Sequence, residues 1–517
     1  MKAIRVFFLL TVFLCLSACK KEDDPGAAPV APSENLKEGK VAVSRVFIGG
    51  KYAVLDAESS TFTVTFPAVT DFSSMNVSFT TDATKIVAGG DRVISSSDVV
   101  DLSAPLTVRL IQDAVYQDYT LVARNTGLPV VRVETPNHRA ITSKEVWMDG
   151  ATLRIERPDG KVDYEGAMEI RGRGNSTWDW YPKKPYALRL HEKGELLGMP
   201  SHKRWILLAN WKDRTILRND AAFWLSSHTG LPYTVRGQYV ELVLNGEHKG
   251  NYYLCEQIKL NKKRVNVEKM DAMETDPAKI TGGYLLEVDT YYDEKYKFQN
   301  GDLFKIPWMV KEPDDDELST AAYNYIRGWI RDREVLMKNG SRVQAHEYEA
   351  DRDVDTAIDY MIVEELTGNH DFYNTWPSPG AHSAYLYKER DGKLYHGPVW
   401  DFDYHTFCPD RTNFWAGADK TLFYPALLKD EKFRTRMIER WNLQKDELRK
   451  LTAYIDEMAS YIRLSESFNH TMWPILDSIN GNENGDTHMT FQESVDRMKN
   501  AFLAKWDWMD KNIRNLR

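Results

Sequence analysis

The sequence has little cysteine, no excess of basic charge and no long apolar run, and each shortage narrows what the protein can be. Its 76 acidic residues outnumber 67 basic ones and give a net charge of −9, so an acidic surface argues against nucleic acid as a partner. The N-terminal apolar run covers about nine residues, whereas a transmembrane helix needs roughly twenty. Of the four cysteines, Cys255 and Cys408 lie outside the N-terminal segment. These two could form a disulfide or stay buried as small apolar side chains.

The N-terminal segment is typical of a bacterial lipoprotein signal. Basic residues near the start precede an apolar centre at 6–14 and the small-residue cleavage sequence LSAC at 16–19. This pattern predicts that residues 1–18 are a signal peptide and that Cys19 is lipidated. We therefore expect an outer-membrane lipoprotein of the cell envelope, periplasmic or surface-exposed, held to the membrane by the lipid on Cys19. Residues 19–38, charged and then rich in Pro and Ala, are expected to be a flexible tether.

Residues 39–126 are rich in Ser, Thr and Val and alternate polar with apolar side chains. TFTVTF at 61–66 and MNVSF at 75–79 are examples, and the glycine pairs at 49–50 and 89–90 fit turns between strands. Short alternating strands of this kind predict an all-β immunoglobulin-like sandwich. No catalytic side chains cluster in this region, so we interpret it as a spacer or adhesion module.

Residues 128–517 mix helical and strand patterns, which predicts an α+β domain. The pair Asn-Gly at 245–246, between two apolar runs, predicts a two-residue β-hairpin turn. Residues 353–367 carry an apolar face at helical spacing. Asp213 is expected to be the N-cap of another helix, and the apolar period over residues 430–517 is helical.

Two acidic loops are the most informative feature of the chain. GNHDFYN at 368–374 follows a predicted helix, and GPVWDFDYH at 397–405 follows a predicted hairpin that turns at 391–392. The hairpin brings both loops to the same side. Helix, acidic loop, hairpin and second acidic loop is the order in which a protein kinase presents its catalytic and its magnesium-binding aspartate.

The two loops suggest different roles for their carboxylates. Asp371 suits a base that orients an acceptor hydroxyl and takes its proton, and Asp401 suits a ligand of the cation that bridges nucleotide phosphates. Asp403 and Asn374 are further candidate metal ligands. Any one of these residues alone fits an ordinary turn, because turns favour Asp for local hydrogen bonding. The ordered set favours a metal site.

An upstream segment, EIRGRGNSTW at 169–178, offers a phosphate site. Its backbone amides and guanidinium groups could cradle phosphates, although the segment also fits a plain exposed hairpin. The candidate phosphate-binding residues are Arg171, Arg173, Asn175 and Ser176. The next strand adds Lys183 or Lys184 as the point charge that a kinase places on its third strand.

The chain resembles the CotH-type spore-coat protein kinase family over residues 128–517. The segments that carry the resemblance are, in order, RGRGNSTWDWYPKKPYALRL, RWILLANWKDRTILRN, GNYYLCEQI, GGYLLEVD, ELTGNHD and GPVWDFD. The resemblance implies an atypical protein-kinase-like, two-lobed fold and magnesium-dependent transfer of phosphate from ATP to serine hydroxyls of a protein substrate. It implies Asp371 as the catalytic aspartate and Asp401 as the magnesium ligand. Lys184 and the loop at 171–176 would face the nucleotide.

Two other classes of function stay open. ATP is scarce outside the cytoplasmic membrane, which leaves room for a catalytically silent binding or adhesion lipoprotein that keeps the fold. A metal-dependent phosphohydrolase is the other alternative, because four histidines lie near the acidic loops: His370, His382, His396 and His405. The chain has no His-x-x-x-His spacing, which transition-metal sites favour. Trp178 and Trp180, in a polar segment, are candidates for stacking on a carbohydrate or cell-surface partner.

Overall fold

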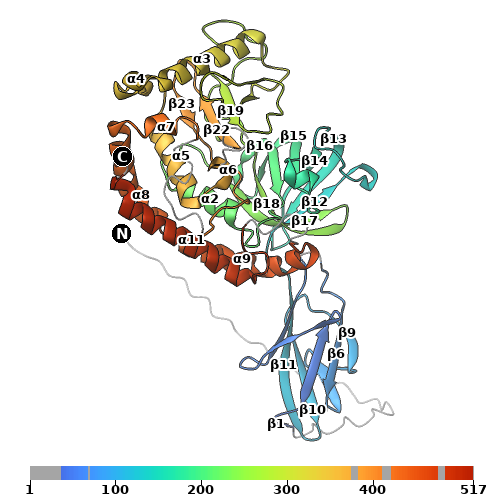
Figure 1. Cartoon of the computed structure of the whole chain (residues 1–517). Helices are drawn as coiled ribbons and strands as arrows, with labels where there is room; N and C mark the ends of the chain where they lie inside the picture. Colours follow the sequence, from blue (N-terminus) through green and yellow to red (C-terminus); the bar gives the residue numbers. More distant parts are fainter. Residues whose placement is uncertain (1–35, 68–69, 374–381, 410–420, 476–483, 516–517) are drawn as a thin grey trace, which may run out of the picture. The chain divides into compact units, whose positions relative to one another are not determined.

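The computed structural model describes residues 36–67, 70–373, 382–409, 421–475 and 484–515 (Figure 1). The predicted signal peptide, Cys19 and Asn374 lie outside these residues. The chain divides into two units. One comprises Met1–Phe62 and Ser74–Val122, and the other comprises Thr63–Ser73 and Ala123–Arg517.

The N-terminal region has strands and no helix among its described residues up to Arg124. The strands form two sheets, ordered β3-β2-β6-β9 and β4-β5-β11-β10-β7-β8, and β1 pairs with β11. In β6 the apolar side chains of Met75, Val77 and Phe79 are buried and alternate with more exposed polar ones, as the period of two predicts. The strands are β1 (Lys37–Glu38), β2 (Val43–Ile48), β3 (Lys51–Tyr52), β4 (Val54–Asp56), β5 (Thr61–Thr65), β6 (Met75–Thr81), β7 (Lys85–Ala88), β8 (Arg92–Ile94), β9 (Ser97–Val100), β10 (Leu106–Gln112) and β11 (Val115–Arg124).

A closed barrel begins the larger unit, with strand order β12-β13-β14-β15-β16-β18-β17. The barrel closes because β12 pairs antiparallel with β13 and parallel with β17. Inward-facing apolar side chains, among them Trp205, Leu207 and Leu242, fill its interior. The predicted hairpin turn is confirmed: Asn245 and Gly246 both have positive φ and join β17 to β18. The strands are β12 (Val130–Glu134), β13 (Met148–Glu156), β14 (Val162–Gly172), β15 (Tyr186–Leu196), β16 (Met199–Leu208), β17 (Gly237–Leu244) and β18 (Glu247–Glu256).

A second sheet in the same unit has the order β20-β21-β19-β22-β23. Its outer hairpin, β22 to β23, is the one predicted between the two acidic loops, with Leu386 paired to His396. Because this sheet is antiparallel, β19 and β22 run side by side and the residues that follow β19 lie next to those that precede β22. The strands are β19 (Tyr284–Val288), β20 (Lys297–Phe298), β21 (Trp308–Glu312), β22 (Ala384–Lys388) and β23 (Leu394–His396).

Helix α5 (Val354–Thr367) delivers the first acidic loop. Asp353 caps its N-terminus by accepting a hydrogen bond from the Thr356 amide, and Gly368 ends it in the left-handed conformation, with φ of 60°. The helix contacts α2, α8, α11 and β23, and most of its side chains are buried. Each fully buried Leu or Ile contributes about 1.5–3 kcal/mol. The loop after α5 therefore starts from a rigid point.

The other helices confirm the helical tail and correct one expectation. Asp213 is not the N-cap of the following helix, because α2 begins at Arg218. Instead, the Asp213 carboxylate accepts hydrogen bonds from the Thr215 and Arg218 amides, at 2.8 Å each. The remaining helices are α1 (Ser176–Asp179), α2 (Arg218–Ser227), α3 (Thr320–Lys338), α4 (Gly340–Gln344), α6 (His370–Tyr373), α7 (Tyr424–Leu427), α8 (Glu431–Leu448), α9 (Leu451–Met472) and α11 (Phe491–Asn512), with 3-10 turns at Pro136–His138, Glu347–Ala350 and Ile513–Asn515.

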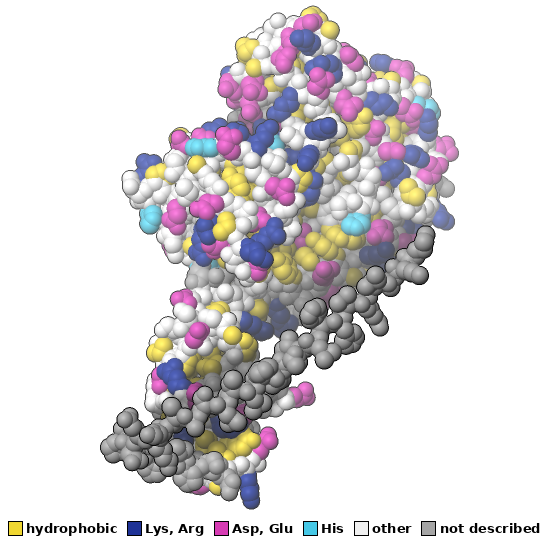
Figure 2. Space-filling model, turned by 180° about the vertical axis from the view of Figure 1, so that it is seen from behind, with side chains coloured by type: hydrophobic (Ala, Val, Ile, Leu, Met, Phe, Trp, Pro, Cys, Tyr) yellow, Lys and Arg dark blue, Asp and Glu magenta, His cyan; other side chains and the backbone are white. Residues whose placement is uncertain are grey.

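The surface carries charged side chains of both signs. On the face in Figure 2, Lys and Arg side chains are interspersed with Asp and Glu, and exposed pairs of this kind contribute little to stability. Cys255 and Cys408 are buried, and neither forms a disulfide within the described residues. Within the described part of the chain, no helix has both the length and the apolar character needed to cross a membrane.

Candidate active site

A cavity of about 710 Å³ lies between the barrel, the second sheet and the two acidic loops. Barrel residues around the end of β14 form one wall, and residues of β19 and β21 form another. Asp371, Asp401 and Asp403 line the third. The cavity therefore unites the glycine and arginine segment with both acidic loops, which lie about 200 residues further along the chain.

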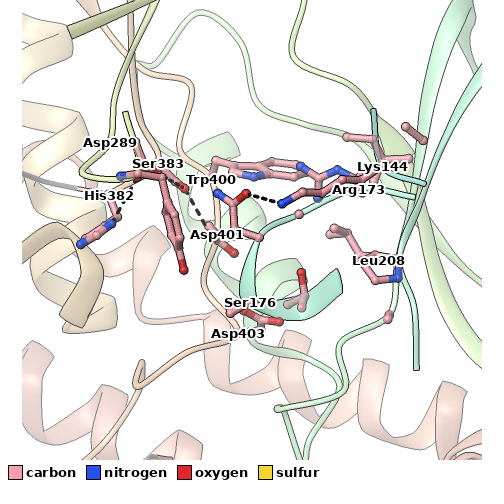
Figure 3. Close-up of a pocket in the computed structure, with 18 of the residues that line it drawn as sticks. Lys144, Arg173, Ser176, Leu208, Asp289, His382, Ser383, Trp400, Asp401 and Asp403 are labelled. Atoms are coloured by element: carbon pink, nitrogen blue, oxygen red, sulfur yellow. Dashed lines mark hydrogen bonds and ion pairs between the residues drawn. The ribbon is translucent and has the colours of Figure 1, made fainter. Parts of the chain in front are cut away.

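Two glycines shape the loop between β14 and α1. A side chain at Gly172 would overlap the indole ring of Trp178, and Gly174 has a φ of +83°, which side chains other than glycine rarely adopt. The loop can therefore pass close to the cavity and turn directly into α1. Arg173 lies between these two glycines, and its guanidinium is 5.2 Å from the centre of the Trp400 ring. It lines the cavity on the side facing the second acidic loop (Figure 3).

The other loop residues predicted to bind phosphate also line the cavity. Asn175 accepts a hydrogen bond from the Lys144 ammonium at 3.1 Å, and Ser176 starts α1. Arg171 donates to the backbone oxygen of Glu145 at 3.2 Å and stacks on Trp147. Burial lowers the pKa of Arg171 from its ordinary value. Lys144 was not among the residues that the sequence pattern indicated.

Of the two lysines after this loop, Lys183 lines the cavity and Lys184 does not. The Lys184 ammonium donates to the Trp178 backbone oxygen, and Lys184 is not part of the cavity lining. Lys183 is fully buried, where its ammonium donates to the Ala209 and Asn251 oxygens and to Asn469 on α9. Burial lowers the pKa of Lys183 to about 7. These contacts tie the barrel to the C-terminal helices and leave no donor for a ligand.

A lysine from the second sheet lines the cavity instead. Lys311 on β21 lies 3.0 Å from the Glu287 carboxylate on β19 and also pairs with Glu294. Its side chain is 28% exposed. Burial raises the pKa of Glu287, although Lys311 opposes that shift. The sequence offers no local signal for this pair, since β19 and β21 are joined only through the fold.

Asp371 is placed by the end of α5. Its amide donates to the Asn369 side chain at 3.1 Å, and Asn369, which is buried, also hydrogen-bonds the carboxyl of Glu364. The Asp371 carboxylate is 20% exposed on the cavity wall. It is more accessible than Asp403, which is buried, and this exposure suits contact with an incoming substrate.

Asp401 and Asp403 lie near each other in the cavity wall, where Asp403 is buried and Asp401 is partly exposed. Burial raises the pKa of Asp401, and the charges of Asp403 and Asp371 raise it further. Burial also raises the pKa of Asp403, against the opposing charge of Lys212. Asp401 has a φ of 70°, a conformation that costs an ordinary residue about 1 kcal/mol or more. The next amide, that of Phe402, donates to Asn219 at 2.8 Å and helps hold this backbone.

A further carboxylate at this wall, Asp289, was missed in the sequence. It follows β19 and accepts hydrogen bonds from the Ser383 amide at 2.9 Å and the Tyr291 amide at 2.8 Å. The Ser383 hydroxyl lies 3.3 Å from both the Asp289 and the Asp401 carboxylates (Figure 3). His382 faces Asp289 from the other side. GGYLLEVD contains Asp289, but nothing in that segment says that it meets the residue before β22.

The donor set favours a hard divalent cation. Within the described residues, no group of three or more His, Cys, Asp or Glu side chains is arranged to hold a metal ion alone. His396 is buried against Arg352 and Tyr424, and His370 stacks on His405. Magnesium instead takes one or two carboxylates and completes its shell with water and substrate phosphates. Asp401 and Asp403 fit that requirement, because a cation would relieve the repulsion between the two neighbouring carboxylates.

Comparison with known proteins gives one decisive match. The family described as CotH kinase protein matches residues 170–509. No curated protein matches the sequence. A crystal structure described as that of a proposed glycoside hydrolase from Bacteroides thetaiotaomicron VPI-5482 is 13% identical, covers 51% of this chain and 63% of its own, and has a TM-score of 0.14. So weak a likeness carries no argument about activity. The family match spans well over half of the sequence and includes residues of all three walls of the cavity, and the chain therefore belongs to the CotH kinase family.

Proposed function

We propose that this protein is a magnesium-dependent atypical protein kinase that transfers phosphate from ATP to serine hydroxyls of a protein substrate. The observation that carries the proposal is that one cavity is lined both by basic residues, Arg173 and Lys311, which we call the basic wall, and by three carboxylates. These carboxylates are Asp371, Asp401 and Asp403. Phosphoryl transfer needs little covalent chemistry from the protein, and depends on positioning and charge stabilisation.

Asp371 is the proposed base. As the serine oxygen bonds to the γ-phosphorus, its proton passes to the Asp371 carboxylate, and the bond from that phosphorus to the bridging oxygen breaks, so that ADP leaves. Asp371 reaches the cavity with its carboxylate partly exposed, whereas Asp403 is buried. Asp401 and Asp403 would hold magnesium, which neutralises the phosphate charge that builds up during transfer.

The basic wall has the chemistry to hold the donor. Arg173, the backbone amides around Gly174 and the Ser176 hydroxyl provide donors to phosphate oxygens. Lys311 adds a point charge that two glutamates hold in place. We assign the nucleotide-binding lysine to Lys311, while the resemblance implied Lys184.

The proposal also covers the domain architecture of the protein and its location in the cell envelope. We propose that the barrel side and the helical side are the two lobes of a kinase-like domain, and that the N-terminal strands form an immunoglobulin-like spacer. The lipoprotein signal supports an envelope protein anchored through Cys19, and the exposed Trp180, at 66%, supports contact with a surface partner. ATP, the donor, would then have to reach the envelope.

Incorporation of labelled phosphate tests the activity. The full chain is incubated with γ-labelled ATP and magnesium, alone and with a generic protein acceptor. Incorporation is expected for the wild type and for the matched control Asp56→Asn, at the exposed end of β4 in the N-terminal region, and not for Asp371→Asn or Asp401→Asn. Release of inorganic phosphate without protein labelling would identify a phosphohydrolase. Failure to bind nucleotide at all would favour the silent binding protein.

A further inference from the structure

We infer that Asp289 and Ser383 are positioning residues for Asp401, and that they set the affinity of this site for a divalent cation. The inference rests on the proposed function, because it assigns a cation to Asp401. It assigns a role to two residues outside both acidic loops. In Figure 3 the Ser383 hydroxyl lies between the two carboxylates, with a dashed contact to each.

Asp289 is built to hold the segment before β22. It accepts hydrogen bonds from the Ser383 amide and hydroxyl, from the Tyr291 amide and from His382. Although burial raises the pKa of Asp289, these hydrogen bonds lower it below the ordinary value. Asp289 is therefore an ionised, well-satisfied carboxylate, with its donors supplied by the protein. A carboxylate occupied in this way serves as an anchor more readily than as a metal ligand.

Ser383 is held in an unusual backbone conformation. Its φ is 51°, in the left-handed region that serine seldom adopts. Two bonds to Asp289 fix that geometry, one from the amide at 2.9 Å and one from the hydroxyl at 3.3 Å. The same hydroxyl then reaches the Asp401 carboxylate. The strained turn therefore places one hydroxyl, with a single proton to donate, within hydrogen-bond distance of both carboxylates.

Asp401 needs this support because its own backbone is also left-handed, at φ of 70°. The Asn219 side chain holds the next amide, while Ser383 contacts the carboxylate itself. Without Ser383, the carboxylate would be free to turn within the cavity. Partners that orient a ligand in this way typically change metal affinity by about 10-fold to 100-fold when removed.

Manganese binding to the full chain without nucleotide tests the inference directly. Free Mn²⁺ is measured by electron paramagnetic resonance during titration of the wild type, Ser383→Ala, Ser383→Gly and Asp289→Asn. We expect about tenfold weaker binding for both Ser383 variants and 10-fold to 100-fold weaker binding for Asp289→Asn. Ser59→Ala is the matched control, because it removes a hydroxyl that donates to Asp56 at 2.8 Å. Its affinity should equal that of the wild type.

The glycine variant separates positioning from folding. Glycine accepts the φ of Ser383 without strain, so a purely structural role would leave Ser383→Gly as good as the wild type or better. Unchanged Mn²⁺ affinity in both Ser383 variants would overturn the inference, even if Asp401-dependent phosphoryl transfer is found. Total loss of binding in Asp289→Asn with no change in the Ser383 variants would make Asp289 a ligand and also overturn it. If the wild type binds no Mn²⁺, the inference fails. If the Ser383 and Asp289 variants bind Mn²⁺ more weakly but the wild type transfers no phosphate, the inference is supported and the proposed kinase activity is rejected.

Discussion

Two groups of carboxylates in this protein face opposite situations. Asp213 and Asp486 share the guanidinium of Arg218, and all three side chains are at most 2% exposed. Asp403 is also buried, with the partly exposed Asp401 near it, yet within the described residues no ion pair joins either to a Lys or Arg. The first group is paired with a cation that the chain itself supplies. The second lies in a cavity without such a pair.

The difference teaches how to separate structural from functional acids. A buried charge is costly unless it is paired, so carboxylates that line a cavity without a Lys or Arg partner are candidates to bind a cation from outside the chain. Arg218 also donates to the Thr406 backbone oxygen at 3.1 Å, which ties α2 to the segment just after Asp403. The paired group thus stabilises the position of the unpaired one.

Arg218→Met is expected to have the largest effect, a loss of about 5 kcal/mol in the free energy of unfolding. Removing one partner of a buried pair costs about 3–5 kcal/mol, and here two carboxylates lose their cation. Denaturant unfolding followed by circular dichroism measures the loss. The double variant with Asp213→Asn should recover part of it. A single variant as stable as the wild type would contradict the division between the two groups.

Asp401→Asn is expected to show the reverse behaviour. Phosphoryl transfer should fall by about 10³-fold or more, since metal-assisted stabilisation contributes several kcal/mol. The thermal midpoint should hold or rise, because one of two neighbouring negative charges is gone. Activity and differential scanning calorimetry on the same sample test both halves. A drop in stability like that of Arg218→Met would place Asp401 with the structural acids.

Asp220 offers a third situation, a buried carboxyl with neither a cation nor a place in the cavity. It accepts hydrogen bonds from Tyr253 at 2.9 Å and Tyr454 at 3.0 Å. Burial raises the pKa of Asp220 to about 6. The folded state therefore holds the proton more tightly than the unfolded state, and stability falls as pH rises from about 4 to about 7, by about 3 kcal/mol.

The comparison with Asp220→Asn isolates this contribution from other titrating groups. The variant should lack that part of the pH dependence, so that its difference in unfolding free energy from the wild type changes by about 3 kcal/mol across the window. Parallel curves for the two proteins would show that Asp220 stays ionised throughout. Asp220 would then be a buried ionised carboxylate, like Asp213 and Asp486 beside Arg218.

The sequence predicted best what depends on local spacing. The hairpin at Asn245-Gly246, the helix that ends at Gly368 and the alternation in β6 were confirmed because each is set by neighbours in the chain. The barrel closure was not predictable, since β12 pairs in parallel with β17 more than a hundred residues away. Asp213 failed as a cap for a similar reason. Its partner Asp486 shares Arg218 only in the folded chain.

The residues of the candidate site also differ in whether local sequence or the fold reveals them. Asp371, Asp401 and Asp403 were predicted as site residues because motif order in the chain indicated them, and all three line the one cavity. Asp289 and Ser383 gave no signal, because they meet only where β19 runs beside β22. Residues that carry charge next to recognisable motifs can be predicted from the sequence. Residues that orient them need the fold.

The two lysines give the smallest expected effect and a direct test of that limit. Lys184 follows the glycine loop in sequence, yet its ammonium is occupied by the Trp178 backbone. Lys311 is distant in sequence, yet it lines the cavity with its ammonium held by Glu287 and Glu294. A charged hydrogen bond to phosphate contributes about 1.5–3 kcal/mol. Lys311→Met should therefore raise the KM for ATP by about tenfold or more, and the matched Lys184→Met should change it by less than about twofold.

Steady-state kinetics on both variants at saturating acceptor gives KM and kcat separately, and thermal unfolding controls for the glutamates that Lys311→Met leaves without their lysine. If Lys184→Met raises KM while Lys311→Met does not, then position after the loop in sequence decides the nucleotide contact. The basic wall would then have to rearrange when ATP binds, because the Lys184 ammonium would first have to leave the Trp178 backbone. If both variants behave like the wild type, Arg173 and the loop amides must carry the phosphate contacts alone. The cation held by Asp401 and Asp403 would then contribute most of the binding energy for ATP.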